Sequence, residues 1–139
     1  MRLEKAYRLW GVDISADWTT IEAGLDRFVD FDKGDFIGRD ALVTQREQGA
    51  TKGLACLVIE TEDRDAHGYE PVRSGREVIG YVAAGGYGPV VQKSIALAYL
   101  PTEFLAPGTE LTVDLVGSEY KATVVEQPLY DPKNQRLLS

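Results

Sequence analysis

The second half of the sequence is a succession of short apolar runs, and this pattern constrains the fold more than any other feature. Glycine or proline residues lie between successive runs. Runs of this length, rich in β-branched and aromatic residues and bounded by turn formers, are typical of β-strands. Six such strands predict a mainly β fold, a six-stranded antiparallel barrel that begins at about residue 50. The runs span residues 54–60, 70–72, 77–84, 94–99, 110–116 and 120–127.

The longest apolar stretch, residues 78–101, consists of two runs joined by the glycine cluster GGYGP at residues 85–89. Glycine and proline interrupt it too often for one helix, so it predicts two strands that are packed on both faces or closed into a barrel. The cluster matches neither the dinucleotide fingerprint nor a P-loop, and no helix start follows it, which argues against a phosphate-binding loop. We therefore predict that it forms the turn between the two strands. A second tight turn is predicted at residues 117–118.

The first 49 residues predict two helices and one short strand. Apolar residues recur three and four positions apart in residues 2–10 and Gly11 follows, which predicts an amphipathic helix with Tyr7 and Trp10 on its buried face. This helix is short and lacks an N-terminal capping residue, so we expect it to pack on polypeptide upstream and the chain to be a fragment. Residues 25–30 predict a strand, and residues 39–48 predict a helix that ends at glycine.

Composition excludes several classes of site and partner. The formal net charge of -7 argues against nucleic acid, because nucleic-acid affinity comes mostly from basic side chains. The single cysteine, Cys56, and the single histidine, His67, cannot assemble a Cys/His metal cluster or an internal disulfide, so we expect no metal and a core position for Cys56. No run approaches the length of a membrane span and no signal peptide is evident, so we expect a soluble cytoplasmic protein with no membrane partner.

Ordered motifs along the whole chain resemble the glycine-cleavage T-protein (aminomethyltransferase) family. Residues 2–11 (RLEKAYRLWG), 22–25 (EAGL) and 36–42 (FIGRDAL) resemble the end of that family's folate-binding domain. Residues 80–82, 85–89, 95–99 and 128–132 resemble its C-terminal barrel. The sequences of residues 33–42 and 128–137 look closer to the C-terminal halves of dimethylglycine and sarcosine dehydrogenases than to a free-standing T-protein.

The resemblance implies two domains and a one-carbon chemistry. Residues 1–49 would be the C-terminal remnant of the folate-binding domain, a helix-strand-helix unit, and residues 50–139 would be the C-terminal barrel. The family transfers a one-carbon unit from a substrate nitrogen or sulfur to tetrahydrofolate, so the implied cofactor is tetrahydrofolate and the implied substrate is a small methylated amine. The family's catalytic aspartate and acidic pterin anchor lie upstream of the first motif. We therefore expect no catalytic residue in this chain and no activity from it alone.

Three basic residues are candidates for folate binding. Arg2 corresponds to the arginine of the family's RLE motif, which the resemblance places near folate; the alternative is an exposed arginine on a frayed first turn. Lys52 and Arg136 match more loosely the basic residues of the first barrel strand and the C-terminal tail that close the family's channel. They suit the glutamate carboxylates of folate, and ordinary surface charges are the alternative. Glu4 could orient Arg2 or Arg8, but we interpret it as a solvated charge on the outer helix face.

Three functions remain open at this point. The first is the C-terminal portion of a tetrahydrofolate-dependent aminomethyltransferase-like enzyme, with the barrel covering one side of the folate channel. The second is a non-catalytic barrel module that acts in protein interaction. The third is a demethylase of the same family that acts on a sulfur substrate. If the helical face with Tyr7 and Trp10 is bare, it could support a homo-oligomer through the exposed N-terminal helix.

Overall fold

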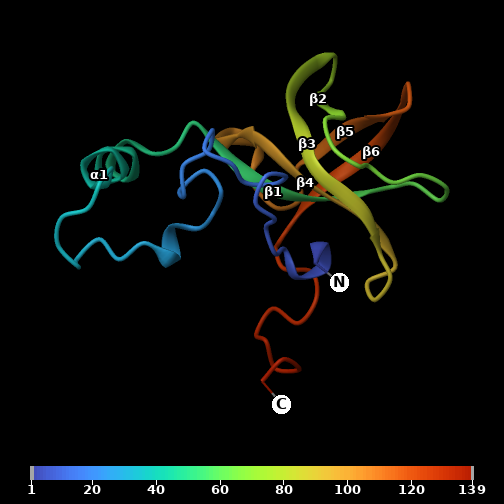
Figure 1. Cartoon of the computed structure of the whole chain (residues 1–139). Helices are drawn as coiled ribbons and strands as arrows, with labels where there is room; N and C mark the ends of the chain where they lie inside the picture. Colours follow the sequence, from blue (N-terminus) through green and yellow to red (C-terminus); the bar gives the residue numbers. More distant parts are fainter. Residues whose placement is uncertain (1, 139) are drawn as a thin grey trace.

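The computed structural model describes residues 2–138, which form a closed antiparallel barrel with peripheral segments (Figure 1). Around the barrel the strands lie in the order β1-β4-β3-β2-β5-β6, which confirms the predicted mainly β fold with a six-stranded antiparallel barrel. The strands are β1 (Lys52–Ile59), β2 (Pro71–Ser74), β3 (Glu77–Gly88), β4 (Lys93–Pro101), β5 (Glu110–Leu115) and β6 (Ser118–Val125). The helices are α1 (Arg39–Gln48) and the 3-10 helices η1 (Leu3–Lys5), η2 (Asp26–Phe28) and η3 (Thr102–Phe104).

Alternate residues of the strands fill the barrel interior. In β5 the buried residues are Leu111, Val113 and Leu115, and the residues between them are only partly buried. Successive side chains of a strand point to opposite faces, so this period of two places one face of β5 in the core. Leu57 of β1 and Val82 of β3 belong to the same core and are fully buried.

Strands β1 and β4 are buried on both faces. For β4 this agrees with one of the two arrangements predicted for residues 78–101, whereas β3, the other strand of that stretch, is buried only at some positions. The outer faces of β1 and β4 carry a second core of Leu54, Cys56, Ile95, Leu97 and Tyr99. Leu3 and Trp18, which precede the barrel, and Leu129, which follows it, pack against this second core. Trp18 stacks on Tyr99 with ring centroids 3.7 Å apart and an interplanar angle of 6°. The core position of Cys56 is confirmed, and burial raises the pKa of its thiol to about 12.

The glycine cluster lies within β3, so the turn predicted for it is wrong except at Pro89. β3 continues to Gly88, and the reversal into β4 occupies residues 89–92. A Cβ on Gly88 would lie 2.6 Å from Ile95 Cδ1, and a Cβ on Gly85 would overlap the carbonyl group of Ala66. Glycine in a strand often marks such a close approach of neighbouring atoms. The cluster therefore serves packing around β3 and not chain reversal.

The β5–β6 hairpin has its tight turn one residue earlier than predicted. Val116 and Gly117 form the loop, with φ of 52° and 79°. Positive φ at both residues of a two-residue loop is the type I′ geometry that matches the twist of the flanking strands. A β-branched residue such as Val116 rarely adopts positive φ, so the sequence predicted the turn at residues 117–118.

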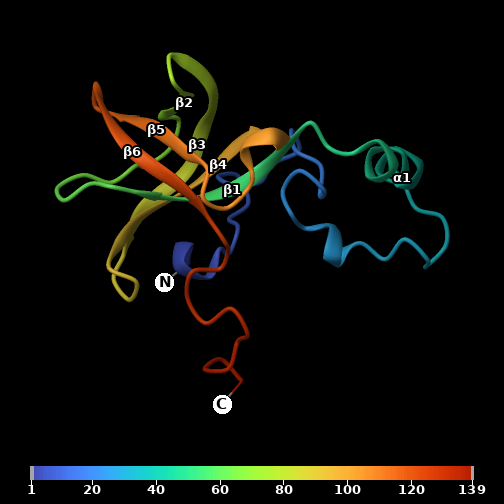
Figure 2. The ribbon, with the colours of Figure 1, turned by 180° about the vertical axis from the view of Figure 1, so that it is seen from behind.

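Helix α1 spans the ten residues predicted for it, and Gly49 follows it with φ of 83°. The helix and the loop before it project from one side of the barrel in both views (Figures 1 and 2). The predicted strand at residues 25–30 is wrong, because η2 occupies this position and Phe28 is 72% exposed. A strand needs a neighbour for its backbone hydrogen bonds, and this segment lies away from the barrel strands. The division into residues 1–49 and 50–139 remains a prediction.

The predicted N-terminal helix is also wrong. Only η1 is helical there, because the chain takes a left-handed conformation at Ala6 with φ of 52°. Tyr7 and Trp10 do not enter the core and are 49% and 71% exposed. The segment instead follows an irregular path along β3 and β4, which supply the contacts that a short uncapped helix lacks. The prediction of a homo-oligomer that forms through an exposed N-terminal helix therefore loses its basis, because residues 6–10 are not helical.

Candidate functional site

The N-terminal segment, residues 2–8, and the C-terminal tail, residues 127–137, are joined beneath the barrel (Figure 1). The backbone amide of Tyr130 donates a hydrogen bond of 3.0 Å to the carbonyl oxygen of Glu4. Lys5 Nζ donates to the Asp131 carbonyl oxygen at 2.8 Å and to Asn134 Oδ1 at 2.6 Å. These contacts link residues more than 120 positions apart, so they depend on the closed barrel that brings both segments together.

Glu4 is fully buried, which corrects its interpretation as a solvated charge. Its Oε1 accepts hydrogen bonds from the backbone amides of Val90 at 2.7 Å and Val91 at 3.0 Å, in the turn between β3 and β4. Burial disfavours the charged form, but the amides of Val91 and Val90 favour it, and the pKa of Glu4 is lowered from its usual value. Glu4 thus fastens the N-terminal segment to the barrel.

Arg2 forms an ion pair with Asp13, whose side chain is fully buried. Arg2 Nη1 also donates to the Tyr7 carbonyl oxygen at 2.9 Å, and the amide of Leu9 donates to Asp13 Oδ2 at 2.8 Å. The Arg2 side chain keeps 34% of its surface exposed. Arg2 is therefore a structural ion-pair partner that still presents part of its side chain to solvent.

A groove of about 450 Å³ lies between the two joined segments, and we call it the tail groove. It brings together two of the three predicted folate-binding residues, Arg2 and Arg136. Arg136 Nη1 donates to Tyr130 Oη at 3.5 Å. Lys52 is exposed at the start of β1 and does not line this groove. The lining residues are Arg2, Lys5, Tyr7, Tyr130, Asp131, Arg136 and Leu137.

Asp131 organises the part of the tail that carries Arg136. Its Oδ1 accepts from the Gln135 amide at 2.8 Å and its Oδ2 from the Arg136 amide at 3.3 Å, and Lys5 Nζ lies 3.5 Å from Oδ2. Desolvation raises the pKa of this carboxyl, but the amides of Arg136 and Gln135 and the charge of Lys5 lower it, and the net direction is down. The ionised Asp131 therefore holds the tail in a turn at one side of the groove.

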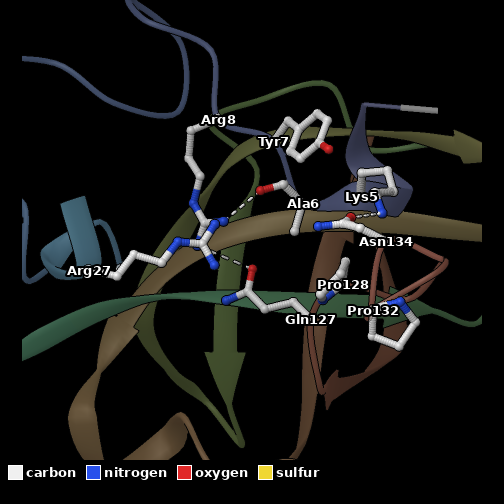
Figure 3. A pocket seen from close by; sticks show the side chains of 10 residues that line it. Lys5, Ala6, Tyr7, Arg8, Arg27, Gln127, Pro128, Pro132 and Asn134 are labelled. Atoms are coloured by element: carbon white, nitrogen blue, oxygen red, sulfur yellow. Dashed lines mark hydrogen bonds between the residues drawn. The ribbon is translucent and has the colours of Figure 1, made fainter. Parts of the chain in front are cut away.

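A second cavity, of about 250 Å³, adjoins the tail groove, and we call it the arginine pocket (Figure 3). Arg8, Arg27 and Lys5 line it, together with Gln127 and Pro128. The sequence pattern did not indicate Arg8 or Arg27 as a site residue. They are 19 positions apart in segments whose predicted structure was wrong, and no motif joins them, so only the tertiary fold shows that they meet.

The barrel and its tail match a known family. The sequence profile of the glycine cleavage T-protein C-terminal barrel domain matches residues 52–131. The chain belongs to this family. The match begins at the first residue of β1, includes every barrel strand and ends at Asp131 in the tail groove. The predicted family resemblance is thereby confirmed.

Relatives of known name match nearly the whole chain. The mitochondrial dimethylglycine dehydrogenase of Rattus norvegicus is 40% identical over 99% of this chain and 16% of its own length. The aminomethyltransferase of Symbiobacterium thermophilum is 42% identical over 98% of this chain and 36% of its own length. The crystal structure of glycine cleavage system aminomethyltransferase T from Bartonella henselae aligns with a TM-score of 0.86 and 28% identity, over 94% of this chain and 37% of that one. The chain thus spans well under half of these relatives and corresponds to their C-terminal portion.

Within residues 2–138 no group of three or more His, Cys, Asp or Glu side chains is placed to hold a metal ion. In the same range no helix has the length and apolar character that crossing a membrane requires.

Proposed function

We propose that this chain is the C-terminal portion of a tetrahydrofolate-dependent aminomethyltransferase-like enzyme and that its barrel covers one side of the folate channel. The observation that carries the proposal is the family match, which covers the whole barrel and ends at Asp131. Asp131 lines the tail groove together with Arg2 and Arg136. The T-protein family is folate-dependent. The one-carbon donor in this proposal is a small methylated amine, and the cytoplasmic location expected from the sequence stays a prediction.

The lining of the tail groove fits part of a folate molecule. Folate combines flat aromatic groups with glutamate carboxylates. The groove offers the rings of Tyr7 and Tyr130 beside two guanidinium groups, and guanidinium binds carboxylate with two parallel hydrogen bonds. Bound tetrahydrofolate would supply the nitrogen that accepts the one-carbon unit. In this proposal Arg136 and the exposed part of Arg2 hold carboxylates, and Lys52, which lies elsewhere, contributes nothing at this groove.

A non-catalytic interaction module is the second candidate, and one observation favours it. The segment that projects from the barrel carries large exposed apolar side chains, with Phe28 72% exposed and Ile37 fully exposed. Trp10, in the segment that precedes it, is 71% exposed. Apolar surface of this kind marks a site of contact with other polypeptide. In the enzyme that polypeptide is the upstream part of the same protein, whereas in the module it is a separate partner.

The reading frame upstream of Met1 separates the two candidates. Several hundred codons in frame, encoding the catalytic aspartate, support the enzyme. A start at Met1 with its own ribosome-binding site supports the module.

Arg136→Gln tests the groove in the complete enzyme. We expect the KM for tetrahydrofolate to rise about tenfold with little change in kcat, because the variant loses a charge-assisted contact to the carboxylates and no reacting group. Steady-state kinetics with varied tetrahydrofolate measures this. Arg76→Gln, which removes the same charge from an exposed turn away from the groove, is the matched control. Equal KM values for the two variants would exclude a role of Arg136 in folate binding.

A further inference from the structure

The arginine pocket concentrates positive charge. Its described lining includes three cationic residues and no carboxylate. The charge of Lys5 is offset by Asp131 outside that lining, with Nζ 3.5 Å from Oδ2. The charges of Arg8 and Arg27 remain, and both side chains line the same cavity of about 250 Å³ (Figure 3).

Arg8 is held in place by neutral acceptors. Its Nε donates to the Ala23 carbonyl oxygen at 3.2 Å, its Nη1 to the Ala6 carbonyl oxygen at 2.5 Å and its Nη2 to Gln127 Oε1 at 3.4 Å. Gln127 is itself fixed, because its Nε2 donates to the Leu54 carbonyl oxygen at 3.1 Å. A guanidinium has five N–H donors, so these bonds orient Arg8 and leave it donors for a ligand.

Arg27 approaches the same cavity from η2, a different part of the chain. Its guanidinium carbon lies 4.8 Å from the centroid of the Phe28 ring, a cation–π contact that orients the side chain. Desolvation and the charge of Arg27 lower the pKa of Arg8, although the charge of Asp13 acts in the opposite direction. Two guanidinium groups that share a cavity without a carboxylate favour an anion between them.

We propose that the arginine pocket is a binding site for a small oxyanion, a carboxylate or a phosphate, held between Arg8 and Arg27. The cavity is smaller than the roughly 300–1,000 Å³ typical of pockets for drug-sized ligands, which argues against a nucleotide and for a ligand of a few heavy atoms. This site adjoins the tail groove and shares Lys5 and Tyr7 with it, but Arg8 and Arg27 line only the arginine pocket, and the inference does not depend on the proposed function.

Titration of the isotopically labelled chain with sodium phosphate and with sodium succinate, at constant ionic strength set with chloride, tests the site. We expect saturable shifts of the Gly24 and Arg27 backbone amide signals, because both residues line the pocket. Arg27→Gln should weaken the binding at least tenfold. Arg27→Lys, which keeps the charge but cannot form bidentate hydrogen bonds, should weaken the binding less. Arg27 is exposed on η2, so these variants should fold, and Arg76→Gln is the control for loss of one surface charge.

The outcomes separate the two sources of oxyanion. Saturation by phosphate alone or by succinate alone supports the site and identifies the group it prefers. Two results would overturn the proposal. One is the lack of saturable shifts with either ion, and the other is binding that Arg27→Gln and Arg76→Gln weaken equally, which would indicate nonspecific screening of charge.

Discussion

Gly80→Ala is expected to destabilise the barrel by about 3 kcal/mol or more. A Cβ at this position would overlap the carbonyl oxygen of Tyr99 in the neighbouring strand and lie 3.0 Å from Leu100 Cδ2. Tyr99 pairs with Leu54 of β1 on its other side, so its backbone cannot move without disrupting the β1–β4 ladder. The free energy of unfolding in urea measures the effect.

Gly53→Ala is the matched control for this substitution. It also adds a methyl group to a barrel glycine, but the nearest atom is Leu105 Cδ1 at 2.7 Å, the end of a side chain that is only partly buried. That side chain can rotate away, so we expect a loss of about 1 kcal/mol or less. If Gly80→Ala cost no more than Gly53→Ala, the backbone contact between β3 and β4 would not be as close as the structure shows.

Glu4→Ala is expected to lower the free energy of unfolding by about 3 kcal/mol and to release the N-terminal segment. The substitution removes the carboxylate that accepts hydrogen bonds from the amides of Val90 and Val91, and a hydrogen bond to a charged group contributes about 1.5–3 kcal/mol. Urea unfolding measures the loss, and hydrogen exchange at residues 2–8 reports the release. Glu126→Ala, at an exposed glutamate, is the control and should be nearly neutral.

The effect of Glu4→Ala should also depend on pH. The folded-state pKa of Glu4 is lowered from 4.5, so its contribution is fully present above that value and is lost as the pH falls through the folded pKa. The difference between wild type and Glu4→Ala should therefore shrink as the pH is lowered from neutral to below 4.5. A constant difference over this range would mean that the carboxylate form is not what the two amides stabilise.

The barrel could be predicted from the sequence because its determinants are local. Residues 95–98 are apolar throughout, and β4 is correspondingly buried on both faces. Residues 110–115 alternate, and β5 is buried on one face. The turn predicted at the glycine cluster was wrong because glycine is common both in turns and where neighbouring atoms approach closely. Only the positions of Ala66 and Ile95 show that close approach is its role here.

The candidate site could be predicted only in part. Arg2 and Arg136 were found through motifs near the two ends of the chain, and the structure places both at the tail groove. The burial of Glu4 has no local signal, because its partners Val90 and Val91 are 86 and 87 residues away. The meeting of Arg8 with Arg27 likewise depends on segments that fold irregularly against the barrel.

We propose that this barrel forms one side of a folate site whose other side comes from the polypeptide that precedes it in its relatives. Titration of the 139-residue chain with a stable folate analogue, alone and joined to the preceding part of the Symbiobacterium thermophilum aminomethyltransferase, tests it most directly. We predict no saturable binding by the chain alone and saturable binding by the joined protein. Tight binding by the chain alone would contradict the claim, as would a joined, folded protein that does not bind.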